Sequence, residues 1–127
     1  MTINCCHFSG NLTRNAEVKT LPSGQSVSEF TVAVNNRQKN VQTGEWENVP
    51  AYIDCSLWGE RATLLEPKMG KGARCVVMGR MKQESWTDRA TGQNRKRLKM
   101  LVDEIEVMEA VAKRESASVY SDDDIPF

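Results

Sequence analysis

Apolar and polar residues alternate with a period of two along most of residues 3–108. This period is typical of β-strands, because successive side chains of a strand point to opposite faces. Turn signals rich in Gly and Pro interrupt the alternation at Pro22-Ser23-Gly24, Thr43-Gly44, Gly70-Lys71-Gly72 and Thr91-Gly92. The pattern therefore predicts five strands, near residues 4–14, 27–37, 48–58, 73–86 and 94–108.

One segment follows a different pattern. Residues 60–66 suit a short helix, which Pro67 ends because the residue before a proline disfavours the helical region. A single helix between the third and fourth of five strands is the order of an OB-fold barrel. We therefore expect a mainly β protein, built as a five-stranded OB-fold barrel with one short helix.

The third predicted strand sorts its side chains into two chemically different faces. One face is apolar and suits the barrel core: Ala51, Ile53, Cys55 and Leu57. The other face carries two large aromatic side chains beside a charge and a hydroxyl: Tyr52, Asp54, Ser56 and Trp58. Burial in the barrel's own core does not explain why these two aromatics stand on the polar face.

The fourth predicted strand repeats this arrangement, because Trp86 shares its polar face with the cations Arg74, Arg80 and Lys82. Aromatic rings among cations on a β surface suit single-stranded nucleic acid. Each ring can stack a base, worth about 1–3 kcal/mol, and each cation can displace phosphate counterions. A subunit interface would also explain outward Tyr and Trp side chains, and this alternative stays open.

Two basic segments adjoin the aromatic faces. Asn36 to Asn40 opens a long polar loop that also carries Trp46, and Arg95 to Lys99 follows the turn at Thr91-Gly92. Charge runs are usually solvated surface, yet beside the aromatics we expect these two to complete a groove. The predicted binding residues are Tyr52, Trp58, Trp86, Trp46, Arg37, Lys39, Arg80, Lys82, Arg95, Lys96, Arg97 and Lys99.

The fifth predicted strand is irregular. Its apolar positions change parity between Val102 and Ile105. A one-residue slip inverts the facing of a strand, so we expect a bulge or sharp bend across Asp103-Glu104.

Length and charge indicate the number of domains and the kind of partner. The 127 residues suffice for one domain with its own core, and 17 Lys and Arg balance 17 Asp and Glu. Residues 1–109 carry 15 basic and 13 acidic side chains, whereas residues 110–127 carry 2 and 4. A mildly basic body followed by an acidic tail fits an anionic partner for the body.

The cysteines and the lengths of the apolar runs indicate the cellular compartment of the protein. Cys5, Cys6, Cys55 and Cys75 form no CxxC pair and lie in apolar runs, so we expect buried free thiols. No stretch reaches the ~20 apolar residues that a membrane span needs, and the N-terminus lacks a signal-peptide pattern. These features predict a cytoplasmic protein.

Catalytic chemistry has little support in the sequence. A metal nuclease would need converging carboxylates, for which Asp103, Glu104, Glu106 and Glu109 can be proposed. Their alternation at a strand end favours a solvated edge. The chain has no phosphate-cradling glycine loop and no nucleophile elbow. We therefore predict a protein that is not an enzyme and holds no metal or cofactor.

Several motifs together resemble one family. They are Gly10-Asn11-Leu12, Phe30-Thr31-Val32-Ala33-Val34, Leu57-Trp58-Gly59, Lys71-Gly72, Trp86-Thr87-Asp88 and the final Asp122-Asp123-Asp124-Ile125-Pro126-Phe127. The chain resembles the bacterial single-stranded DNA-binding proteins, usually called SSB, over nearly its whole length. An acidic run that ends in Ile-Pro-Phe is the most specific of these marks.

The resemblance implies an OB-fold subunit, usually in a homotetramer, with single-stranded DNA wrapped over the barrels. Three aromatic positions that stack bases in the family match Tyr52, Trp58 and Trp86, which the strand faces already singled out. A fourth family tryptophan falls at Gln38, so one stacking platform is missing unless Trp46 takes its place. The family role is sequence-independent protection of single strands in replication, recombination and repair. A specialised OB module for primosome assembly or RNA is the alternative.

The C-terminal segment suits neither helix nor strand, because three adjacent acids repel one another and resist burial. We expect an OB domain at 1–109, a short flexible linker at 110–121 and a disordered acidic tip at 122–127. The resemblance implies that this tip recruits genome-maintenance proteins such as exonucleases, helicases and recombination mediators. A linker this short is compatible with a phage, plasmid or compact chromosomal protein.

Overall fold

The computed structural model describes residues 1–108, so the predicted linker at 110–121 and acidic tip at 122–127 lie outside the described residues. Six strands occupy most of this part: β1 (Cys6–Leu12), β2 (Glu17–Thr20), β3 (Ser26–Lys39), β4 (Trp46–Trp58), β5 (Arg74–Thr87) and β6 (Asn94–Val107). A short helix, α1 (Glu60–Leu64), and a 3-10 turn, η1 (Glu66–Lys68), stand between β4 and β5. Among residues 1–108, no helix has the length and apolar character to cross a membrane.

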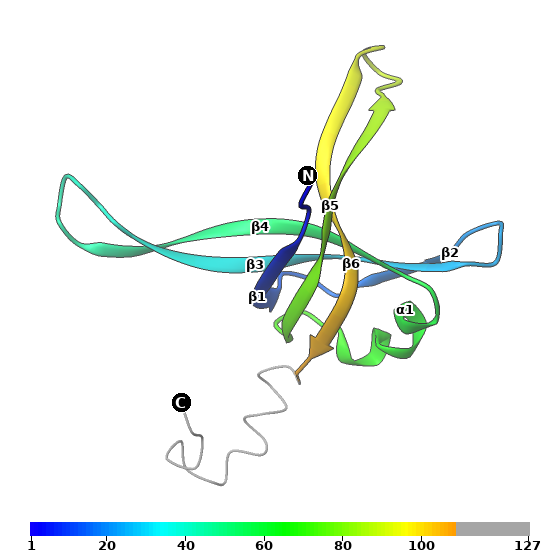
Figure 1. Cartoon of the computed structure of the whole chain (residues 1–127), viewed down its shortest axis with the longest axis horizontal. Helices are drawn as coiled ribbons and strands as arrows, with labels where there is room; N and C mark the ends of the chain where they lie inside the picture. Colours follow the sequence, from blue (N-terminus) through cyan, green and yellow to red (C-terminus); the bar gives the residue numbers. More distant parts are fainter. Residues whose placement is uncertain (109–127) are drawn as a thin grey trace, which may run out of the picture.

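Five of the strands close into a barrel (Figure 1). β1 pairs antiparallel with β5, β5 antiparallel with β6, β6 parallel with β4, and β4 antiparallel with β3. Pairing of Asn11 with Ala33 and of Leu12 with Val32 returns β1 to β3 and closes the ring. The predicted mainly β, five-stranded OB-fold barrel, with one helix between its third and fourth strands, is confirmed.

β2 is absent from the sequence prediction. Its four residues pair antiparallel with β3, from Glu17 opposite Glu29 to Thr20 opposite Ser26. The segment Glu-Val-Lys-Thr carries a single apolar residue, too short an alternation to indicate a strand. β2 therefore forms because it pairs with the exposed edge of β3. The apolar pattern of residues 17–20 alone does not predict a strand.

The barrel core consists of inward-facing apolar residues from the five barrel strands and from the segment after η1: Leu12, Phe30, Val32, Cys55, Leu57, Met69, Ala73, Cys75, Val77, Met100 and Val102. The helix is shorter than predicted, because α1 ends at Leu64 and Pro67 lies in the first turn of η1. Buried Ala62 of α1 and Met69 after η1 belong to the chain segment that closes one end of the barrel (Figure 1).

The cysteines are free but not all buried. Burial raises the pKa of the Cys55 thiol to about 12 and that of Cys75 to about 11, so both stay protonated and packed in the core. Cys6 is half-buried and Cys5 is exposed. The prediction of four buried thiols is therefore wrong for Cys5, because this residue precedes β1 and lies outside the barrel.

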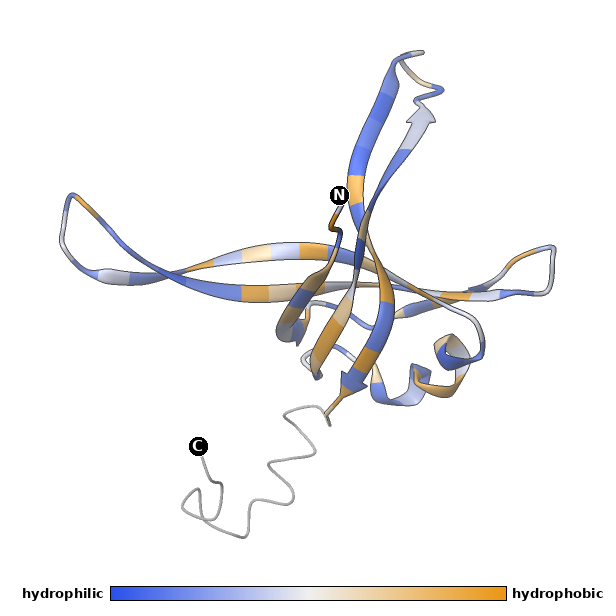
Figure 2. Ribbon diagram, in the orientation of Figure 1, coloured by the Kyte–Doolittle hydropathy of each residue, from blue (hydrophilic) through white to orange (hydrophobic). Residues whose placement is uncertain are grey.

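Two hairpins extend beyond the barrel as two-stranded arms: the β3–β4 arm (residues 35–50) and the β5–β6 arm (residues 83–98) (Figure 1). The predicted long loop after Asn36 is wrong, because β3 continues to Lys39 and β4 begins at Trp46. Gly44 and Gly92 adopt φ of 77° and 72° in the tip turns, a conformation that glycine allows without strain. Figure 2 shows apolar residues gathered where the strands cross, and a largely hydrophilic β5–β6 arm.

The predicted irregularity in the last strand is confirmed. Met78 pairs with Glu104, but the next residue, Gly79, pairs with Val102, so Asp103 has no partner on β5. A bulge of this kind bends a strand and increases its twist. It lies at Gly79, where the pairing of β5 with β1 ends, four residues before the arm begins.

Candidate nucleic-acid interface

The outward face of β4 carries three aromatic side chains at intervals of six residues. Trp46, Tyr52 and Trp58 are 61%, 64% and 41% exposed, which confirms the predicted exposure of Tyr52 and Trp58. Equal parity places all three on one face, and a strand rises about 3.3 Å per residue, so neighbours lie roughly 20 Å apart. β4 therefore presents a row of stacking surfaces that runs from the barrel onto the β3–β4 arm.

A hydrogen bond ties this face to the neighbouring strand. The Thr31 hydroxyl on β3 donates to Oδ1 of Asp54 at 2.8 Å, between Tyr52 and Trp58 in the β4 sequence. Asp54 is half-buried, and this hydrogen bond fixes the position of its Oδ1. The aromatic row therefore also contains a carboxylate, which the Thr31 hydroxyl holds against β3.

Trp46 is positioned by the β3–β4 ladder. It pairs with Lys39, and the Arg37 guanidinium lies 5.7 Å from the centre of its ring. Such a cation–π contact orients both side chains. Gln38 pairs with Glu47 and so faces the opposite side of the arm from Trp46. Trp46 therefore does not occupy the place that an aromatic side chain at position 38 would take.

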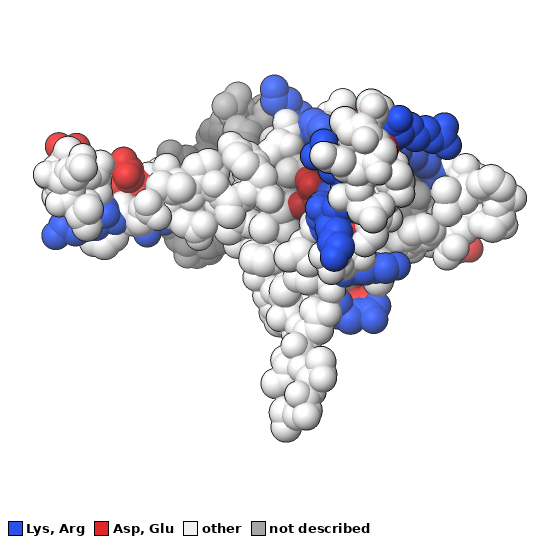
Figure 3. Space-filling model, turned by 90° about the horizontal axis from the view of Figure 1, so that it is seen from above, with Lys and Arg blue, Asp and Glu red and all other residues white. Residues whose placement is uncertain are grey.

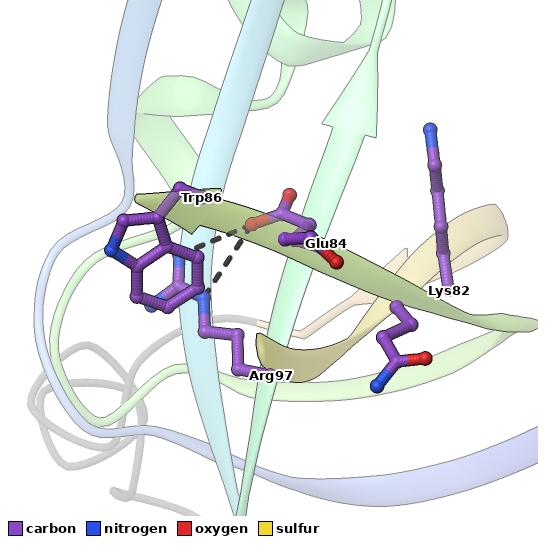
Figure 4. A pocket seen from close by; sticks show the side chains of 6 residues that line it. Lys82, Glu84, Trp86 and Arg97 are labelled. Atoms are coloured by element: carbon purple, nitrogen blue, oxygen red, sulfur yellow. Dashed lines mark hydrogen bonds and ion pairs between the residues drawn. The ribbon is translucent and has the colours of Figure 1, made fainter. Parts of the chain in front are cut away.

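The β5–β6 arm presents Trp86, which is 45% exposed. The Arg97 guanidinium lies 5.6 Å from the centre of its ring and 3.5 Å from the Glu84 carboxylate (Figure 4). These three residues and Lys82 line an open pocket of about 550 Å³. The pocket combines a ring for a base with two cations for phosphates, on the same face of the arm.

The predicted cations do not all lie together. Trp86 pairs with Arg95 and Glu84 with Arg97, whereas Lys96 pairs with Ser85 and so faces the opposite side of the arm. Two of the predicted cations are in ion pairs: Arg80 lies 3.3 Å from Asp103, and Arg95 lies 3.4 Å from Asp88. Exposed pairs of this kind are weak, so a phosphate can replace the carboxylate at small cost.

Lys99 differs from every other predicted cation. It is 7% exposed, and its Nζ lies 2.8 Å from Oε2 of Glu29 and 3.5 Å from Oε1 of Glu84. Hydrogen bonds from Lys99 and Lys19 lower the pKa of the Glu29 carboxyl to about 2, so it is anionic at neutral pH. The positive charge of Lys99 is therefore already compensated inside the protein.

A small cavity joins the barrel face to the arm. Its lining consists of Ser56, Trp58, Lys82, Glu84, Lys99 and Leu101, so Trp58 on β4 faces the base of the β5–β6 arm. Ser56 has the outward parity of Trp58 but is only 6% exposed, because this junction covers it. Seen from above, Lys and Arg side chains gather around the β5–β6 arm, and a second basic group lies at the tip of the β3–β4 arm (Figure 3).

The carboxylates at the end of β6 make contacts within the fold. Asp103 pairs with Arg80, and Glu104 pairs with Arg61 at 3.5 Å. Within residues 1–108, no group of three or more His, Cys, Asp or Glu side chains is arranged to hold a metal ion. Glu109, the fourth residue of the proposed nuclease cluster, lies outside the described residues.

Sequence reasoning missed two acids on this face. Glu84 shares parity with Lys82 and Trp86, and a hairpin turning at Gly92 places it opposite Arg97, so that pair was open to prediction. Glu29 had no comparable signal, because its partner Lys99 lies 70 positions away in the sequence. Only the closed barrel brings Glu29 and Lys99 together.

The fold and this face define the class: an OB-fold barrel that presents aromatic rings and cations on one continuous surface. The sequence profile of the Single-strand binding protein family matches residues 3–108. The chain belongs to this family, as the sequence motifs indicated.

Individual relatives agree with this assignment. The single-stranded DNA-binding protein of Borreliella burgdorferi is 39% identical over 105 residues, which span 83% of this chain and 69% of that protein. The protein of the same name from Mycobacterium tuberculosis is 41% identical over 97 residues, or 76% of this chain and 58% of that protein. This chain thus spans about three fifths to two thirds of these relatives.

A solved structure has the same fold. The crystal structure of a deletion mutant of the single-stranded DNA binding protein from Thermus aquaticus superimposes with a TM-score of 0.73. The match covers 87% of this chain and 52% of that chain, at 21% sequence identity. At this identity the likeness supports the barrel topology.

Proposed function

We propose that this protein binds single-stranded DNA, largely without regard to base sequence, and protects it during replication, recombination and repair. One observation carries the proposal: exposed aromatic rings and cations share a continuous face from β4 to the β5–β6 arm. Family membership supports it, as do the names of the Borreliella and Mycobacterium relatives.

Binding in this proposal combines stacking with charge. Bases stack on Tyr52, Trp58 and Trp86, at about 1–3 kcal/mol each, and every base has an aromatic face, so the sequence matters little. Trp46 adds a fourth ring on the β3–β4 arm. Phosphates are met by the exposed cations that share a face with these rings: Arg37, Lys39, Arg80, Lys82, Arg95 and Arg97. Lys96 can add a phosphate contact only from the opposite side of the β5–β6 arm. The role is binding without chemical conversion of the DNA.

We also propose that the protein works as a homo-oligomer, a homotetramer in particular, in the cytoplasm. Val76 and Met78 on β5 are 40% and 39% exposed, and they line a pocket together with Ile105, Glu104 and Glu106. Two exposed apolar side chains with Glu104 and Glu106 opposite them on β6 give a mixed surface that can contact a second copy. Free cysteines, with Cys55 and Cys75 reduced in the core, are usual in a reducing cytoplasm.

The proposal includes a docking role for the C-terminal tip. A partner can hold Phe127 in an apolar pocket, bind its carboxylate with Arg or Lys, and attract Asp122, Asp123 and Asp124 with a basic rim. Ile125 and Pro126 complete the apolar end. The apolar residues of the tip would then serve replication and repair partners.

Oligo(dT) is expected to quench the tryptophan fluorescence of the full chain, because thymine stacks on Trp58 and Trp86. Affinity should fall with salt, with log K decreasing by about 0.7 per log unit of salt for each phosphate contact. Titrations at three salt concentrations measure both effects, and light scattering of the same samples gives the assembly and the DNA stoichiometry. Absence of both quenching and binding at low salt contradicts the proposed function.

Competition separates the proposal from the specialised-module alternative. Oligo(dT), an RNA of equal length and duplex DNA are each added to a preformed complex with labelled oligo(dT). We expect oligo(dT) to displace the label best and duplex DNA worst, because paired bases offer no free face for stacking. Preferential displacement by the RNA supports an RNA-binding module instead.

Deleting Phe127 should abolish partner docking while leaving DNA affinity unchanged or slightly higher. The deletion moves the terminal carboxylate and removes the apolar group that a pocket would hold, whereas the barrel is untouched. Capture of purified candidate replication and repair proteins by immobilised full-length and truncated chains measures the difference. Adding one residue after Phe127 should abolish capture as well, because it displaces the carboxylate that the partner binds. Equal capture by all three chains would make the tip only a solubilising segment.

A further inference from the structure

Lys99 occupies a junction between three strands. It belongs to β6, and its Nζ lies 2.8 Å from Glu29 on β3 and 3.5 Å from Glu84 on β5. At 7% exposure, it is the most buried charged side chain among residues 1–108. A buried charge persists only when paired and hydrogen-bonded, so the two carboxylates hold this amine in one position.

The contacts continue from Lys99 to Trp86 on the arm. Glu84 also accepts from Arg97, and the Arg97 guanidinium lies against the Trp86 ring (Figure 4). An unbroken series of polar contacts thus links β3 of the barrel wall to the exposed ring of the arm. Each step is within 3.5 Å, except the cation–π contact at 5.6 Å.

The arm needs such an attachment. β1 pairs with β5 only as far as Gly79, and β4 pairs with β6 only at Met100 and Leu101. Beyond these points, β5 and β6 form a ladder only with each other, apart from the Asn4 side chain, which bonds the Met81 carbonyl at 2.8 Å and the Met81 N–H at 2.9 Å. An isolated two-stranded ribbon is marginally stable and strongly twisted, so contacts at its base must set its direction.

The junction at Lys99 lies between the Trp58 ring on β4 and the Trp86 ring on β5. Trp58, Lys99 and Glu84 line one small cavity, and Trp86 is two residues beyond Glu84 on the same face of β5. A change in the angle of the arm would therefore change the separation of the Trp58 and Trp86 rings. That separation must match the spacing of stacked bases if both rings are to bind one strand.

We propose that Lys99 is a positioning residue: by bridging Glu29 and Glu84 it holds the β5–β6 arm against the barrel and sets the separation of Trp86 from Trp58. The inference rests on the proposed single-strand binding. Lys99 itself touches no phosphate in this proposal. The arm has its binding orientation before DNA binds, so binding does not include the entropic cost of ordering the arm.

Lys99→Met tests the inference in the full chain, because it keeps an unbranched side chain, one atom shorter, and removes the charge. We expect oligo(dT) affinity to fall about tenfold. In the variant, one or two side chains of the arm would have to become ordered on binding, and that ordering weakens affinity by about this factor. The salt dependence should stay unchanged, since no phosphate contact is lost. Lys99→Arg, which keeps the charge, should recover at least part of the affinity.

A spectroscopic measurement follows the arm directly. In a Trp46→Phe/Trp58→Phe background, Trp86 is the single tryptophan, and without DNA Lys99→Met should lower its fluorescence anisotropy and increase its quenching by acrylamide. Lys68→Met on exposed η1 is the matched control for loss of one positive charge and should change neither. Because this readout needs no DNA, it tests the positioning role even if the protein fails to bind oligo(dT).

A neutral triple variant keeps the test decisive. Lys99→Met leaves Glu29 only Lys19 and Glu84 only Arg97 as cationic partners. Glu29→Gln/Glu84→Gln/Lys99→Met removes this excess of negative charge, and it should fold and show the same mobile Trp86. Unchanged anisotropy in this folded triple variant overturns the positioning role. A salt dependence weakened by about one phosphate contact, with unchanged anisotropy, identifies Lys99 as a phosphate ligand and also overturns it.

Discussion

Replacing Trp58 and Trp86 together by Ala should weaken oligo(dT) binding by roughly 30-fold to 20,000-fold. Each stack is worth about 1–3 kcal/mol, and every 1.4 kcal/mol is a factor of ten. The two rings are 41% and 45% exposed, so their removal opens no cavity in the core and the barrel should remain folded. Fluorescence anisotropy of a labelled oligo(dT) measures the affinity without relying on the tryptophans that have been removed.

Two controls separate stacking from structure. Trp58→Phe/Trp86→Phe retains a flat ring at both positions and should keep most of the affinity. Leu64→Ala removes a 71% exposed apolar side chain from α1 and should leave binding unchanged. Circular dichroism and light scattering report folding and assembly. An Ala double variant that unfolds or dissociates would assign the rings to structure, and one that binds normally would exclude them as stacking platforms.

Gly79→Ala should destabilise the barrel by about 3 kcal/mol, which lowers Tm by roughly 10 °C for a chain of this size. A Cβ at this position would lie 2.1 Å from the Leu101 carbonyl oxygen and 3.0 Å from Val102 Cα. Both are backbone atoms, which cannot move aside without breaking the strand pairing. Thermal unfolding at one fixed protein concentration measures the effect.

Gly70→Ala is the matched control for this change. A Cβ there would meet only Asn15 Oδ1, at an ordinary 3.5 Å, so stability should change by less than about 1 kcal/mol. If the Gly79→Ala protein is as stable as the Gly70→Ala protein, the backbone of β6 at Leu101 does not approach Gly79 as closely as the structure shows. The position matters for function, because the bulge opposite Gly79 lies at the base of the arm that carries Trp86.

Much of the barrel was predictable because its signals are local. The outward parity of Tyr52 and Trp58 follows from alternation within one strand, and the turns follow from glycines that tolerate positive φ. The bulge at Asp103 was visible as a change of apolar parity within six residues. Such signals depend on neighbours in the sequence, so no knowledge of the fold is needed to read them.

The errors have a common physical origin in pairing between distant segments. β2 forms because β3 offers an edge, and the polar residues after Asn36 stay extended because β4 pairs with them as far as Trp46. Polar composition predicts a loop for both segments, since an exposed strand buries too little apolar surface to show an alternating pattern. Hydrogen bonding across the ladder outweighs that composition.

The sequence by itself determined that this protein is a small barrel with aromatic rings on its polar face, because alternation and turn chemistry act over a few residues. Only the tertiary structure decided which cations are free to meet a phosphate and which are already compensated. Lys99 and Arg97 are two positions apart on β6, yet one is buried against Glu29 and the other lies exposed on Trp86. Contacts across 70 positions make that difference, and only closure of the barrel brings such positions together.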